Sequence, residues 1–225
     1  MLITEGTPLD DRPYFSGDGD AAAPGQVQEA YDNLRVIRQV MERSTKYSTL
    51  SGFSGVIVGC WALLGVAITR WLILPLERRE PFTASVTALA ATWMAVFALS
   101  VATDLLVTKS RAVRVGKQVF SRLGLHMVAA AAPGFSAGLA ITLYFVSRGQ
   151  VNAVWPFWML SYGIAICAVG QFSVRPVSYL GWAFLAAGAA TLFLLPMYGL
   201  WMMAIAFGGF HIAYGLYTGV TRKDW

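Results

Sequence analysis

The sequence predicts an all-α membrane protein, a bundle of six transmembrane helices preceded by a cytoplasmic amphipathic helix. Hydrophobic residues make up 56% of the 225 residues and charged residues only 13%, whereas a soluble domain carries about 25% charged residues. From Leu50 onward, several apolar stretches reach the roughly 20 residues that a helix needs to cross a bilayer. Charged or proline-containing breaks divide these stretches into six.

The breaks have physical causes. Pro81 follows the charged run 77–80, and residues 148–150 carry Arg, Gly and Gln. Arg175 and Pro176 form the next break, and Pro196 leaves room for only a very short turn. The predicted spans are residues 50–69 with a continuation through 71–74, 84–106, 124–146, 154–172, 178–195 and 197–218. The transmembrane domain therefore covers residues 49–219, and residues 220–225 form a short tail.

The segment before the membrane divides in two. Residues 1–25 are acidic and rich in Gly, Pro and Ala, a composition typical of disorder. Residues 26–48 contain an amphipathic helix and its junction to the first span, because apolar residues recur there at spacings of three and four. These are Val27, Ala30, Leu34, Ile37 and Met41. Such a helix either lies on the membrane surface or packs under the bundle, or it binds a partner or a second copy.

The basic residues orient the bundle. If the N-terminus is cytoplasmic, thirteen of the 17 Lys and Arg residues lie in cytoplasmic segments. The other four are Arg70, Arg78, Arg79 and Arg148. The positive-inside rule then places both termini in the cytoplasm, and we expect the bacterial inner membrane. Because the basic residues are scattered over separate loops, they indicate contact with anionic lipid rather than nucleic acid.

Small residues at a spacing of four mark faces where helices can approach closely. The pairs are Gly55 and Gly59, Gly134 and Gly138, and Gly215 and Gly219. The sequence does not say whether these helix-packing glycines lie within one bundle or between subunits.

Ionisable groups inside a membrane are the best pointer to function. The predicted spans place four such polar residues in the cytoplasmic half: Asp104, His126, His211 and Tyr214. They could serve a proton or a polar substrate, together with a helix break at Pro133. Alternatively, Asp104 pairs with Lys109 or Arg111, and His211 is a hydrogen-bonded core residue.

The sequence carries no Walker loop, HExxH or GxSxG motif. Cys60 and Cys167 both lie in predicted spans and follow no metal-binding pattern. The two histidines are not placed at matched depth for haem. We therefore expect neither an enzyme nor a cofactor or metal site.

Three short stretches carry a resemblance: residues 41–55, Phe172 to Arg175 and Gly208 to His211. They are similar to stretches of uncharacterised bacterial six-span membrane proteins, and the likeness covers most of residues 27–218. That resemblance implies the six-span fold and no established activity.

We therefore expect a non-enzymatic inner-membrane protein that acts through assembly, as a homo-oligomer or as an accessory subunit of a membrane complex. The lipid bilayer and other membrane subunits are then its partners. The alternative is a small transporter or channel with a polar path near Asp104, Pro133 and His211.

Overall fold

The computed structural model describes residues 32–35, 52–76, 82–114 and 122–222. The chain divides into two units, residues 1–44 and 45–225. Of the first unit, only a helical turn at 32–35 is described, and its side chains are exposed. The predicted disordered segment and most of the predicted amphipathic helix, including Val27, Ala30, Ile37 and Met41, lie outside the described residues.

The second unit contains six helical stretches that are long and apolar enough to cross a membrane, as the sequence predicts, so this is a multi-pass membrane protein. The stretches are Gly52–Ile73, Phe82–Ser110, Leu123–Ser147, Val151–Gly170, Arg175–Phe193 and Pro196–Thr221. No strand occurs in the part of the chain that the structure describes.

Three spans are single helices, and three combine several helical segments. The single helices are α4 (Phe82–Arg114), α5 (Arg122–Ser147) and α7 (Arg175–Phe193). The first span comprises α2 (Gly52–Ile68), the π-helical segment η1 (Thr69–Ile73) and α3 (Leu74–Leu76). The fourth comprises η2 (Val151–Ala153) and α6 (Val154–Gly170). The sixth comprises η3 (Pro196–Tyr198), α8 (Gly199–Met203), the π-helical segment η4 (Ala204–Phe210) and α9 (His211–Arg222).

The helix ends differ from the predicted spans for local reasons. Arg175 and Pro176 start α7 instead of preceding it, because a proline in the first turn loses no helix hydrogen bond. The end of α5 is capped by Gly149, whose positive φ of 69° allows two closing hydrogen bonds. These run from the Gly149 amide to the Val146 carbonyl (3.0 Å) and from the Gln150 amide to the Phe145 carbonyl (2.8 Å).

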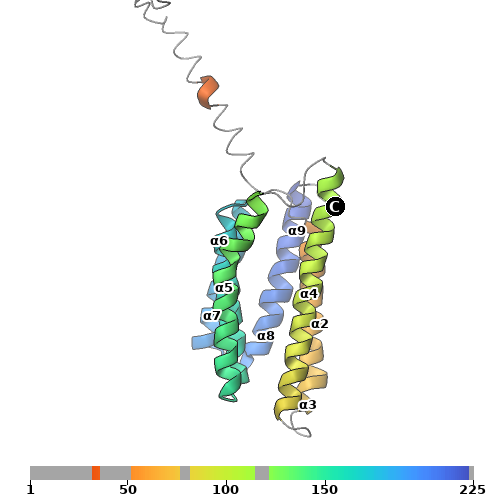
Figure 1. Cartoon of the computed structure of the whole chain (residues 1–225), viewed down its shortest axis with the longest axis vertical. Coiled ribbons are helices and arrows are strands. Elements are labelled where there is room, and N and C mark those ends of the chain that lie inside the picture. The colour runs from red at the N-terminus through yellow and green to blue at the C-terminus, as the bar shows by residue number, and fades with distance from the viewer. Residues whose placement is uncertain (1–31, 36–51, 77–81, 115–121, 223–225) are drawn as a thin grey trace, which may run out of the picture. The chain divides into compact units, whose positions relative to one another are not determined.

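The spans pack as two neighbouring groups (Figure 1). In one group, α2 lies between α4 and the sixth span, and in the other α6 lies between α5 and α7. The sixth span joins the groups, since η4 also contacts α7, and α8 also contacts α6. The buried core forms where these elements meet, and it contains Val66 of α2, Met159 of α6, Phe184 of α7 and Met203 of α8.

Glycines bring three pairs of helices into backbone contact: α2 with the sixth span, α5 with α6, and α6 with α7, where a Cβ on Gly163 would lie 3.0 Å from the Gly181 carbonyl oxygen. A Cβ atom added to Gly59 of α2 would lie 2.7 Å from the Gly208 carbonyl oxygen, and one added to Gly215 would lie 2.5 Å from the Gly52 carbonyl oxygen. A Cβ on Gly134 of α5 would likewise meet the Ser161 carbonyl oxygen of α6 at 2.8 Å. We call these lines of close contact between two helices seams. The remaining glycines of the predicted pairs also lie on them: Gly55, Gly138 and Gly219. Within one chain, these faces are already occupied.

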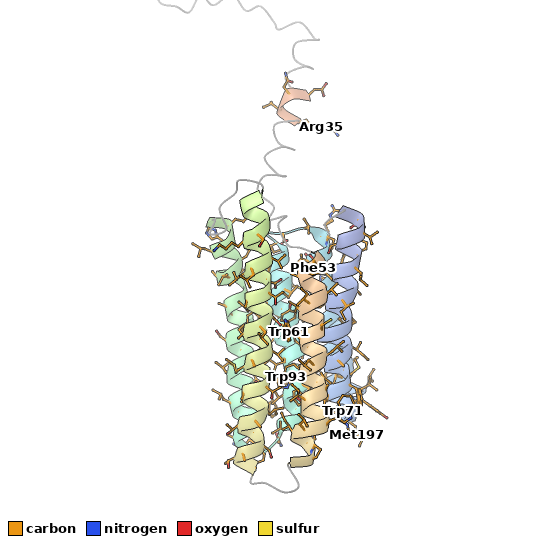
Figure 2. All side chains as sticks on the ribbon, turned by 90° about the vertical axis from the view of Figure 1, so that its right-hand side faces the viewer. Arg35, Phe53, Trp61, Trp71, Trp93 and Met197 are labelled. Carbon is orange, nitrogen blue, oxygen red and sulfur yellow. The ribbon has the colours of Figure 1, made fainter. Side chains whose placement is uncertain are left out.

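Tryptophans mark the depth of the bundle (Figure 2). Trp71 lies at the end near Met197, Phe53 lies near the opposite end, and Trp61 and Trp93 lie between them. The two inner tryptophans, Trp61 and Trp93, pack against neighbouring helices. The Trp61 Nε1 donates to the Thr103 hydroxyl of α4 at 3.3 Å. The Trp93 ring packs against Trp155 with 5.8 Å between centroids.

Candidate intramembrane polar site

His211 is the most deeply buried of the predicted polar residues. It is the first residue of α9, directly after the π-helical segment η4, and only 5% of its surface is exposed. Its Nδ1 lies 2.9 Å from the Phe207 carbonyl oxygen, and its Nε2 lies 2.7 Å from the Tyr162 hydroxyl of α6. A carbonyl oxygen can only accept, so Nδ1 carries the proton and Nε2 accepts from Tyr162. Both ring nitrogens of a neutral histidine are thereby satisfied.

Aromatic rings surround this histidine–tyrosine pair. Phe184 of α7 lies 4.6 Å from the Tyr162 ring and 5.4 Å from the His211 ring, measured between centroids. Phe207 and Phe210 of η4 complete the cluster through Phe184. In such an apolar surrounding, an imidazole or hydroxyl without a partner costs about 1–3 kcal/mol. The hydrogen bond between Tyr162 and His211 therefore joins α6 to the sixth span with high directional specificity.

The π-helical geometry of η4 contributes to the site. A π-helix inserts an extra residue into the helical turn, and such bulges often occur at functional positions. Here the segment ends at Phe210, and its Phe207 carbonyl oxygen accepts a hydrogen bond from the His211 side chain. The side chain of the first residue of α9 thus bonds back to the π-helical segment.

Asp104 belongs to a different contact, between α4 and α2. It sits half-buried on α4, and its carboxyl group is hydrogen-bonded to the Ser54 side chain of α2. Asp104 and Tyr214 contribute to the electrostatic environment of the Tyr162 hydroxyl. Of the predicted polar residues, His211 is joined to Tyr162 by a hydrogen bond of 2.7 Å.

The other predicted residues lie apart from this cluster. His126 is exposed on α5, and so is Pro133, which α5 accommodates within one continuous helix. Of the two basic residues considered as partners for Asp104, Lys109 is exposed, and the Arg111 side chain is outside the described part. Of the predicted partner-binding helix, only Leu34 is described, and its side chain is 62% exposed.

Sequence reasoning missed Tyr162. The available signal was a hydroxyl-bearing side chain in the middle of an apolar span, and this signal does not identify a partner 49 residues away. Trp155, near the start of the fourth span, is 5% exposed and packs against Trp93. Nearness to a span end predicts the depth of a residue, but not the face on which it lies.

Chemically, the site is a neutral, hydrogen-bonded pair inside an aromatic cluster. Among the residues that the structure describes, no group of three or more His, Cys, Asp or Glu side chains is placed to hold a metal ion. Comparison with protein-family models, curated proteins and solved structures finds no match to this chain.

Proposed function

We propose that this protein is a non-enzymatic component of the bacterial inner membrane that acts through assembly, as a homo-oligomer or as a subunit of a larger membrane complex. The observation that carries the proposal is the outer face of α4. In the most apolar stretch of this span no residue is buried, whereas 44% of the corresponding stretch of the fourth span is buried. Within the chain, α4 makes most of its contacts with α2, and two of its aromatic rings also meet rings of α5 and α6.

Small residues line the exposed face of α4. Ala91, Ala95, Ala98 and Ala102 are all exposed and follow one another at spacings of four, three and four. This spacing places them on one helix face. In membranes, small residues are enriched where helices meet, because they let backbones approach and gain van der Waals contact. We call these four residues the α4 alanine face, and we assign it to the contact with another subunit.

The glycine seams support this assignment indirectly. The faces that the sequence alone offers for assembly contain Gly55, Gly134 and Gly215, and all three are occupied by helices of the same chain. Contact between subunits therefore requires another surface, and the α4 alanine face offers small residues at comparable spacing. In the proposed orientation both termini are cytoplasmic, a placement supported by the distribution of basic residues.

The test is native mass measurement of the purified protein in mild detergent. We expect an oligomer or a defined complex, and we expect the double variant Ala95→Leu/Ala98→Leu to dissociate it by holding the helices apart. Ala186→Leu is the matched control, since Ala186 is exposed on α7. A monomeric wild-type protein without partners, or equal dissociation by the control, would exclude this role for α4.

The Tyr162–His211 pair favours a second candidate, a small transporter or channel. Ionisable groups within spans commonly mark ion or proton paths, and Asp104 contributes to the electrostatic environment of Tyr162. On this hypothesis, Asp104→Asn abolishes flux in proteoliposomes while the oligomeric state persists. Wild-type vesicles that show no flux of protons or small ions argue against it.

A further inference from the structure

The turn between α7 and η3 is the least polar of the three turns at its end of the bundle. The turns that follow the first and third spans lie at the same end, because successive spans run in opposite directions. The first of them contains the charged run 77–80, and residues 148–152 of the second include Arg, Gln and Asn. The third turn, residues 193–198, reads Phe-Leu-Leu-Pro-Met-Tyr, and no Asp, Glu, Lys or Arg occurs between Arg175 and Arg222. This turn therefore has almost none of the polar side chains that usually accompany a turn in water.

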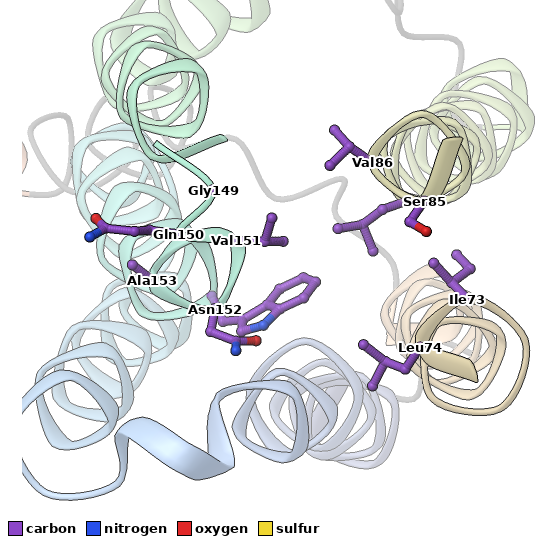
Figure 3. A pocket seen from close by; sticks show the side chains of 11 residues that line it. Ile73, Leu74, Ser85, Val86, Gly149, Gln150, Val151, Asn152 and Ala153 are labelled. Atoms are coloured by element: carbon purple, nitrogen blue, oxygen red, sulfur yellow. The ribbon is translucent and has the colours of Figure 1, made fainter. Parts of the chain in front are cut away.

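The apolar turn lies at the same level as the polar turn beside it. η3 contacts η2, and a Cβ atom added to Gly199, directly after η3, would lie 2.8 Å from Trp155 Cδ1. Gln150 and Asn152 of the polar turn line a pocket of about 430 Å³ at this end of the bundle (Figure 3). Both turns thus lie where spans begin and end, at the boundary between membrane and water.

The side chains of the apolar turn face outward. Met197 is 92% exposed, Phe193 is 78% exposed and Leu194 is 76% exposed. Met197 lies at the end of the bundle near Trp71, as Figure 2 shows. Large apolar side chains that are exposed together usually mark contact with a membrane or with another protein.

Two observations favour lipid over a protein partner. The turn continues the exposed faces of both helices that it joins, since Trp182 is exposed on α7, and Trp201 and Ile205 are exposed on the sixth span. In addition, its exposed side chains are long and flexible, whereas small residues are enriched where membrane helices meet. The turn differs in this respect from the α4 alanine face.

The backbone of the turn is compatible with contact with lipid. The Leu194 and Leu195 amides both donate to the Ala190 carbonyl, at 2.9 and 3.1 Å, and the Tyr198 amide donates to the Leu195 carbonyl at 3.0 Å. Pro196 has no amide hydrogen to satisfy. Backbone groups in lipid must find their hydrogen bonds within the protein, and these amides already do so.

We propose that this turn inserts into the leaflet at its end of the bundle, with Phe193, Leu194 and Met197 among the acyl chains of the phospholipids. The turn at 148–152, at the same level, faces water instead. The two turns then hold this end of the bundle at a fixed depth. The proposal concerns a different surface from the α4 alanine face and does not depend on the oligomeric state.

The experiment measures the accessibility of spin labels on the full-length protein in phospholipid nanodiscs, where both membrane surfaces meet the solution. Single cysteines carry the label in a Cys60→Ala/Cys167→Ala background, and Met197→Cys is the probe. Ile205→Cys is the control for lipid, because Ile205 is exposed within the sixth span, and Gln150→Cys is the control for water, because Gln150 is exposed in the polar turn. Oxygen concentrates among acyl chains, whereas a nickel chelate stays in water. We expect the ratio of oxygen to nickel accessibility at position 197 to resemble that at 205 and to exceed that at 150 several-fold.

Two results would overturn the proposal. A label at position 197 that is as accessible to nickel as the label at 150 would place the turn in water. A label at 197 that is protected from both reagents would show that protein covers the turn, from a second copy or another subunit. Leu194→Cys repeats the measurement at a second exposed position, so that one perturbing label does not decide the outcome. Circular dichroism verifies that each labelled variant is folded.

Discussion

The first span contacts its two main neighbours in different ways. Toward the sixth span, α2 presents Gly52, Gly55 and Gly59, and the backbones of the two helices touch. Toward α4, the same helix makes contact through side chains. Trp61 reaches Thr103, and Gly65 lies under the Val96 side chain, 2.8 Å from the position of an added Cβ.

This difference shows which part of the bundle is rigid. A seam limited by backbone atoms has no side chain that can move aside, so an added methyl group must displace a whole helix. A seam limited by side chains can adjust through rotamers and small helix shifts. The contact between α2 and the sixth span therefore anchors the core, while the contact between α2 and α4 is the more adjustable of the two.

The largest expected effect comes from adding one methyl group to the rigid seam. Gly59→Ala would place its Cβ 2.7 Å from the Gly208 carbonyl oxygen and 2.6 Å from Ile212 Cγ1. We expect a loss of about 1–3 kcal/mol in the free energy of unfolding, the usual cost of overpacking. Denaturant unfolding in micelles, followed by circular dichroism, measures it.

Two glycines provide matched controls for Gly59. Gly65→Ala, on the same helix, meets the Val96 side chain and should cost less than Gly59→Ala. Gly209→Ala meets nothing within 4 Å, and removal of a helical glycine should stabilise by about 0.5–1 kcal/mol. If all three variants lost the same stability, the distinction between the two seams would be wrong.

The second test concerns the hydrogen bond that joins α6 to the sixth span. Tyr162→Phe keeps the ring that packs on Phe184 but removes the hydroxyl that His211 Nε2 accepts. A buried acceptor without its donor costs about 1–3 kcal/mol, so we expect a loss near the middle of that range in the same unfolding assay. Tyr144→Phe is the control, because Tyr144 is 55% exposed. A folding free energy unchanged from wild type would show that the pair does not hold these elements together.

The sequence was sufficient to predict the spans, but not the contacts between them. Long apolar stretches specify a span almost independently of its neighbours, since the backbone must satisfy its own hydrogen bonds in lipid. The extension of α4 to Arg114 was missed because charged residues from Lys109 onward end the apolar stretch without ending the helix. The π-helical segments η1 and η4 were missed because one extra residue in a turn leaves the composition of a span unchanged.

The polar site was predictable only in part, because depth and helix face carry different information. The sequence placed His126 and His211 in the same half of the membrane. His126 is exposed, however, whereas His211 is buried with only 5% of its surface exposed. Which face is covered depends on packing between helices that are distant in sequence. Tyr162 illustrates this limit, since its partner lies on α9, and α7, η3, α8 and η4 come between α6 and α9 along the chain.

The smallest expected effect is at the adjustable seam. Trp61→Phe removes the indole N–H that donates to the Thr103 hydroxyl at 3.3 Å. Thr103 keeps a second bond, from its own hydroxyl to the Leu99 carbonyl at 2.8 Å. The variant removes the indole N–H and leaves the Thr103 hydroxyl with its bond to Leu99, so the change leaves no further buried polar group without a partner. We therefore expect the free energy of unfolding to fall by only about 0.5–1 kcal/mol. Combining Trp61→Phe with Gly59→Ala should give nearly additive losses, since each acts on a different seam. Strong coupling between the two in a double-mutant cycle would show that α4 and the sixth span respond as one body.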